Sequence, residues 1–142
     1  IIEEKAQDYV FGYCIVNDVS ERSWQKERGG QWIKGKSIAG PCGPYLVTKN
    51  EIKDINNINL TLDVNGERRQ TGNTERMIFN FNFLISHISQ FMTLYPGTII
   101  TTGTPAGTAM EMSVPKFLVA NDKLNLKVDY LGEQNQVVID ES

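Results

Sequence analysis

The sequence predicts a β-rich α+β domain, and three patterns in its 142 residues carry this prediction. Several short stretches either alternate apolar with polar residues or run through β-branched and aromatic residues, as strands do. The stretch 60–71 contains an Asn-Gly pair, which is a strong short-range signal for a β-hairpin. A longer stretch, 80–94, has helical spacing. We expect a single domain over 1–142 with one longer and one short helix.

The first third of the chain is expected to hold two strands around a short helix and a long irregular stretch. Residues 9–16 (YVFGYCIV) are apolar and rich in β-branched and aromatic residues, which predicts a buried strand. Residues 19–27 predict a short helix. The glycine- and proline-bearing stretch that follows, to residue 44, is expected to be irregular. A second strand is expected at 45–48.

The middle of the chain predicts a hairpin followed by the longer helix. Residues 60–64 alternate apolar with polar side chains, and the Asn65-Gly66 turn predicts a return strand over 67–71. Phe83, His87 and Phe91 recur at helical spacing within 80–94, before a Pro-Gly pair that ends the helix.

The last third predicts a buried strand, a glycine-bearing turn and a closing hairpin. The strand is expected at 98–102, immediately before the turn Gly103-Thr104-Pro105-Ala106-Gly107. Residues 124–130 alternate apolar with polar side chains, and a Leu-Gly turn predicts a return strand at 136–139.

Composition narrows the classes of function. The chain has 14 Lys and Arg against 17 Asp and Glu, so a nucleic-acid backbone is not an expected partner. No run reaches the roughly 18 apolar residues that cross a membrane, so we expect no membrane partner. Two cysteines do not make a disulfide framework, and we expect a cytoplasmic location. The single histidine, His87, argues against a multi-histidine metal site.

Asp18 is the first candidate for chemistry, because it lies where the expected first strand ends. A carboxylate held there by rigid backbone suits a hard cation such as Mg²⁺. Asp18-Val19-Ser20-Glu21 also has the spacing of a capping box, so a second interpretation is that Asp18 caps the short helix. Spacing alone favours the cap.

Lys36 and the turn at 103–107 are two further candidates. Lys36 lies in a glycine-bearing loop, where a lysine either stabilises an enolate or oxyanion in a pocket or faces water. The backbone N–H groups of the turn and the Thr104 hydroxyl could hold a substrate carboxylate. An ordinary tight turn explains the same residues equally well.

Other reactive side chains give weaker signals. Arg22 and Gln25 are three residues apart on the expected short helix and share a face, which lines a site or faces solvent. His87, on the apolar face of the longer helix, is more typical of a packed or partner-contacting residue than of a catalyst. Cys14, in the expected buried strand, is interpreted as a small apolar filler.

Taken together, these segments resemble the fumarylacetoacetate hydrolase family. The matching stretches keep the family's order over nearly the whole chain and lie at 9–13, 17–22, 30–37, 43–48 and 96–107. The runs at 20–22, 28–32 and 131–134 look most like the branch that acts on 2,4-diketo-3-deoxy sugar acids, whose members are often labelled ureidoglycolate lyase.

The resemblance implies a mixed β-sandwich roll that forms a homodimer, and a Mg²⁺ or Mn²⁺ ion held by one aspartate and a Glu-x-Glu pair. It implies hydrolytic C–C cleavage of a 2-oxo or 1,3-diketo acid through an enolate, with the metal ion as Lewis acid. Carried over residue by residue, the metal ligand is Asp18, the catalytic lysine is Lys36, and the substrate-binding residues are Arg22, Gln25, Gly103 and Thr104.

The chain departs from the family pattern in three places. No Glu-x-Glu pair precedes Asp18, the histidine that many members use as a base is absent, and Ala39-Gly40 stands where Asp-Thr is usual. Because the chain begins at Ile1 rather than methionine, we interpret it as truncated at its N-terminus, which accounts for the first two departures. Two alternatives stay open: an inactive, self-associating β-roll, and a small-molecule binding module without turnover.

Overall fold

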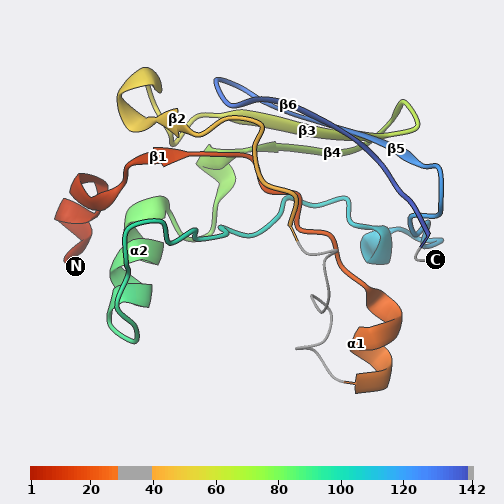
Figure 1. Ribbon diagram of the computed structural model, residues 1–142, viewed down its shortest axis with the longest axis horizontal. Helices are drawn as coiled ribbons and strands as arrows, with labels where there is room; N and C mark the ends of the chain where they lie inside the picture. Colours follow the sequence, from red (N-terminus) through yellow and green to blue (C-terminus); the bar gives the residue numbers. More distant parts are fainter. Residues whose placement is uncertain (29–39, 141–142) are drawn as a thin grey trace.

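The computed structural model describes residues 1–28 and 40–140 and has the predicted α+β class. Figure 1 shows the larger, four-stranded sheet along the top and the two α-helices below it. The sheet is antiparallel with the order β4-β3-β5-β6, and β1 and β2 form a separate two-stranded sheet. The strands are β1 (Gly12–Tyr13), β2 (Val47–Thr48), β3 (Asn59–Val64), β4 (Glu67–Asn73), β5 (Lys123–Val128) and β6 (Gly132–Val137).

Both predicted hairpins of the larger sheet are confirmed. Asn65 and Gly66 join β3 to β4 with φ angles of 53° and 80°, which is the backbone that the Asn-Gly pair supplies at low energetic cost. The return strand β6 begins at Gly132, four residues before the predicted position, because the turn after β5 takes only Asp129, Tyr130 and Leu131.

The core lies on one face of this sheet. In β5, Leu124 and Leu126 are buried and the residues between and beside them are not, as the period of two requires, and in β3 Val64 is buried. Ile58, just before β3, is 1% exposed and is the most deeply buried large side chain in the described residues. The rest of the buried cluster consists of Ile15, Ile52, Val64, Leu124, Leu126 and Leu131.

Both α-helices are shorter than predicted. The longer helix, α2 (Phe81–Ser89), begins where the Asn80 side chain accepts a hydrogen bond from the Phe83 N–H at 2.8 Å. It ends at Ser89 rather than at residue 94. The short helix, α1 (Arg22–Arg28), begins three residues after the predicted start. Short 3₁₀ helices complete the described elements: η1 (Glu3–Tyr9), η4 (Lys49–Glu51), η5 (Thr74–Arg76) and η6 (Ala109–Glu111).

Two strand predictions are wrong in part or in whole. Within 9–16 only Gly12 and Tyr13 belong to a strand, and Phe11 is 71% exposed. Residues 98–102 form no strand, and Ile99 is 60% exposed. Both segments have the composition of a buried strand, but in the described part of the chain the first is only partly covered, with Ile15 in the core, and the second is largely exposed. Across residues 1–28 and 40–140, no helix has the length and apolarity needed to cross a bilayer.

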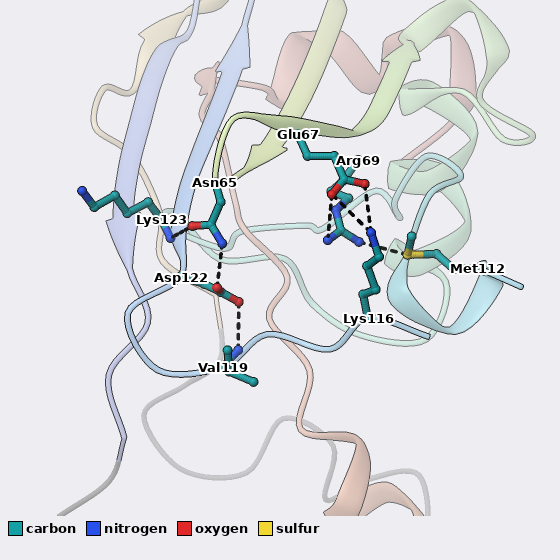
Figure 2. Close-up of polar contacts among 8 residues, drawn as sticks. All are labelled: Asn65, Glu67, Arg69, Met112, Lys116, Val119, Asp122 and Lys123. Atoms are coloured by element: carbon teal, nitrogen blue, oxygen red, sulfur yellow. Dashed lines mark hydrogen bonds and ion pairs between the residues drawn. The ribbon is translucent and has the colours of Figure 1, made fainter. Parts of the chain in front are cut away.

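Polar contacts tie residues 107–122 to both sides of the β3–β4 turn (Figure 2). The Glu67 carboxylate lies 3.5 Å from the Arg69 guanidinium and 3.4 Å from the Lys116 ammonium. On the other side of the turn, Asp122 accepts a 2.8 Å hydrogen bond from the Asn65 side chain. The hairpin therefore anchors the segment that follows the 103–107 turn.

Candidate functional site

The turn 103–107 rests against β4, and Gln70 makes the main polar contact between them. The Gln70 amide nitrogen donates to the Pro105 carbonyl at 2.8 Å and lies 3.0 Å from the Thr104 hydroxyl oxygen. Gln70 is partly buried, whereas Thr104 is exposed. The strand therefore holds the turn from behind and leaves the Thr104 side chain open to a ligand.

Two glycines allow the turn and the strand to approach this closely. A Cβ at Gly107 would lie 2.0 Å from the Arg69 carbonyl oxygen, and the φ angle of Gly107 is +108°. A Cβ at Gly72 would lie 2.9 Å from Pro105. The Gly107 backbone packs on the backbone of Arg69 and the Gly72 backbone packs on the Pro105 ring, so these positions leave no room for a side chain.

A capping box fixes the far end of the same turn. The Glu111 carboxylate accepts hydrogen bonds from the Thr108 and Gly107 N–H groups, each at 2.8 Å, and the Thr108 side chain completes the box. These bonds, chiefly that from Thr108, lower the pKa of the Glu111 carboxyl. The Thr-x-x-Glu pattern that signals this box is visible in the sequence.

Asp18 does not cap the short helix, so the capping-box interpretation is wrong. Because α1 begins at Arg22, Glu21 takes the capping position, and its carboxylate accepts the Ser23 N–H at 2.9 Å. Hydrogen bonds from Ser23 lower the pKa of Glu21. Asp18 is exposed in the connection between β1 and α1, which descends from the sheet in Figure 1.

A chain of amides fixes the backbone that leads to Asp18. Gln134, on β6, is 8% exposed, and its amide nitrogen donates to the carbonyls of Gly43 at 2.6 Å and of Ile15 and Pro41 at 3.3 Å. Gln136 links Gln134 to the Asn17 side chain through two 2.7 Å hydrogen bonds. The sequence patterns gave no sign that these amides support the site.

The structure places most of the predicted site residues along one concave surface. Asp18, Arg22, Gly103 and Thr104 all line it. The surface is wide and its lining includes residues from Ile1 to Asp140, so sharing it does not by itself place these residues next to one another.

Of the remaining site predictions, Gln25 lies on α1 beside Arg22. The Arg22 guanidinium donates to the Gln25 side-chain oxygen at 2.9 Å, so these two residues do share a face. Lys36, the predicted catalytic lysine, lies outside the described residues. The convergence of Asp18 and Lys36 on one metal ion therefore stays a prediction.

The described residues do not form a metal site by themselves. They contain no group of three or more His, Cys, Asp or Glu side chains able to hold an ion together. Asp18 is a hard oxygen ligand of the type that Mg²⁺ and Mn²⁺ accept, and it supplies one ligand only.

The two cysteines lie side by side, which the sequence did not predict. The Sγ atoms of Cys14 and Cys42 are 3.3 Å apart on segments joined by the Val16–Cys42 bridge. Burial, with a smaller contribution from Cys42, raises the pKa of the Cys14 thiol to about 11. Cys14 is half-buried rather than a fully packed filler.

His87 lies in an exposed row of aromatic rings along α2. Its ring stacks on Phe83 at 5.7 Å and meets Phe91 edge-on at 5.1 Å, and Phe79 stacks on Phe83 at 4.8 Å. The row presents an apolar surface rather than a catalytic group.

Comparison with known proteins shows the family of this chain. The family model described as "Fumarylacetoacetate (FAA) hydrolase C-terminal" matches residues 1–139. A relative from Burkholderia ambifaria is 52% identical over 137 residues, which are 94% of this chain and 49% of the relative. The name of this relative describes it only as a hydrolase.

Solved structures agree. Fumarylacetoacetate hydrolase from Exiguobacterium antarcticum is 36% identical with a TM-score of 0.90, over 99% of this chain and 51% of that one. Maleylpyruvate hydrolase from Sphingobium sp. SYK-6, in complex with manganese(II) and pyruvate, is 30% identical with a TM-score of 0.87, over 100% and 49%. This chain thus spans about half the length of the proteins that it matches.

Proposed function

Because this chain belongs to the fumarylacetoacetate hydrolase family, we propose that the whole protein is a divalent-metal-dependent hydrolase, lyase or isomerase of 2-oxo or 1,3-diketo acids. The preferred reaction is hydrolytic C–C cleavage of a diketo acid. One observation carries the proposal: the braced 103–107 turn and Asp18 line the same concave surface. The manganese(II) and pyruvate named for the Sphingobium hydrolase support the same choice of metal and substrate class.

Each part of the site has a role in this proposal. Asp18 supplies one ligand to a Mg²⁺ or Mn²⁺ ion, and the rest of the protein supplies the others. A divalent ion provides Lewis-acid stabilisation of the negative charge that develops on a 2-oxo acid. Thr104 and the N–H groups beside Gly103 hold the substrate carboxylate. Arg22 and Gln25 contact the substrate from α1, and Lys36 adds positive charge.

The test uses the full-length protein with an acylpyruvate, following pyruvate release in the presence of Mn²⁺. Asp18→Asn should remove detectable turnover and weaken Mn²⁺ binding, measured by electron paramagnetic resonance. Asp8→Asn, at another exposed aspartate, is the matched control and should leave both unchanged. Turnover and Mn²⁺ affinity that survive Asp18→Asn contradict the proposal.

The aromatic row along α2 favours self-association as a second candidate function. The row could form the interface of an active homodimeric enzyme, or self-association could be the function of a protein without turnover. Phe91 is 76% exposed beside His87, and Phe79 is 53% exposed beside Phe83. Sedimentation of the full-length protein tests this directly. A dimer that Phe91→Ser converts to monomer supports it, and a monomeric wild type contradicts it.

A further inference from the structure

We propose that Gln70 is a positioning residue that turns the Thr104 hydroxyl into a hydrogen-bond donor aimed at a substrate carboxylate. This inference rests on the proposed function, since it concerns the same substrate. It assigns the selectivity for an anionic end group to a strand residue that faces the turn from behind.

The chemistry of the Pro105 carbonyl fixes the orientation of the Gln70 amide. A carbonyl oxygen only accepts hydrogen bonds, so the atom of Gln70 that lies 2.8 Å from it is the NH₂ group. The same nitrogen lies 3.0 Å from the Thr104 oxygen. Its second hydrogen therefore points at Thr104, and the Thr104 oxygen accepts.

A hydroxyl oxygen that accepts from Gln70 keeps its own proton for another acceptor. Among the described residues, the acceptor nearest to the Thr104 hydroxyl is the Pro105 carbonyl at 3.5 Å, which is at the outer limit for a hydrogen bond. That carbonyl already receives the shorter bond from Gln70. Because Thr104 is exposed, its proton is available to a ligand on the concave surface.

A carboxylate is the ligand that suits this arrangement. An ionised carboxylate accepts hydrogen bonds and donates none, so it matches a hydroxyl whose proton faces outward. Hydrogen bonds to a charged acceptor are also stronger than those between neutral groups. The backbone contacts at Gly72 and Gly107 hold the turn against β4, so Thr104 is in place before the ligand binds.

The experiment measures pyruvate binding to the full-length protein with Mn²⁺ present, by isothermal titration calorimetry. Gln70→Met keeps the side-chain length but removes the donor, and we expect affinity to fall about tenfold, the effect of one hydrogen bond to a charged group. Gln70→Glu reverses the polarity, because an ionised carboxylate accepts the Thr104 proton. Its loss should be larger than that of Gln70→Met, because the introduced negative charge also repels the substrate carboxylate.

A double-mutant cycle separates positioning from a structural role. In a Thr104→Val background, Gln70→Met should change pyruvate affinity by less than about twofold, because the hydroxyl through which Gln70 acts is gone. Gln90→Met, at the exposed end of α2, is the control for the substitution itself and should leave affinity unchanged.

The outcomes distinguish this inference from the function on which it rests. Loss that depends on Thr104, with a larger loss in Gln70→Glu than in Gln70→Met, supports both. Pyruvate binding that survives Gln70→Met, or an equal loss with and without the Thr104 hydroxyl, overturns the role of Gln70 and leaves the proposed function standing. A wild-type protein with Mn²⁺ that binds no pyruvate overturns the ligand class and the proposed function together.

Discussion

Replacing Gly107 with alanine tests whether the contact between the 103–107 turn and β4 is needed for activity. The new Cβ would lie 2.0 Å from the Arg69 carbonyl oxygen, whereas real Cβ atoms essentially never come within 3.0 Å of a neighbour. The turn must therefore move away from β4 by about 1 Å, and a displacement of that size in a substrate-positioning group costs on the order of 100-fold in rate.

Gly97→Ala separates this collision from backbone strain. Gly97 has a φ angle of +90°, close to the +108° of Gly107, but a Cβ there would meet nothing within 4 Å. Both variants bear the strain of a left-handed alanine, about 1–3 kcal/mol. Only Gly107→Ala must also move the turn.

We expect kcat/KM for a diketo acid to fall about 100-fold in Gly107→Ala and less than about fivefold in Gly97→Ala. Both full-length variants are first checked for a cooperative thermal transition, so that an unfolded protein is not read as an inactive one. Equal kcat/KM values for the two folded variants would refute the argument that backbone contact with β4 places the turn.

Three further predictions concern stability and reactivity. Gln134→Leu removes a buried donor from three carbonyls and should lower the free energy of unfolding by about 1–3 kcal/mol in urea titrations; an unchanged urea midpoint contradicts this. The lowered pKa of Glu111 stabilises the fold above the ordinary Glu pKa, and this contribution disappears as pH falls through the lowered value. Glu111→Gln should therefore lower the melting temperature at pH 7 more than at pH 3, and a pH-independent difference excludes the linkage. Cys42 is exposed while burial raises the pKa of Cys14 to about 11, so mass spectrometry should find iodoacetamide on Cys42 first, and faster labelling of Cys14 would contradict the geometry.

The features that the sequence predicted correctly depend on local chemistry. The β3–β4 hairpin is specified within about a dozen residues, by the alternation over 60–64 and the Asn65-Gly66 turn that follows it. The start of α2 is likewise local, because Asn80 is its own capping signal. Such elements need no knowledge of distant parts of the chain.

The features that the sequence missed depend on contacts between distant segments. Gln70 and Thr104 are 34 positions apart, and no spacing rule relates a strand residue to a later turn. The apolar composition of 98–102 indicates burial without naming the partner, so the strand prediction there failed. The predicted start of α1 was wrong for another reason. Asp18 and Glu21 are both plausible caps, and only the folded structure selects Glu21.

The close seating of the 103–107 turn on β4 bears on how new specificities can be engineered. A turn packed on strand backbone tolerates little change of shape, so it suits an end group that is the same in every substrate of such an enzyme. Libraries aimed at a longer or bulkier acid should therefore leave this turn and strand unchanged and randomise α1, which carries its side chains on a separate helix.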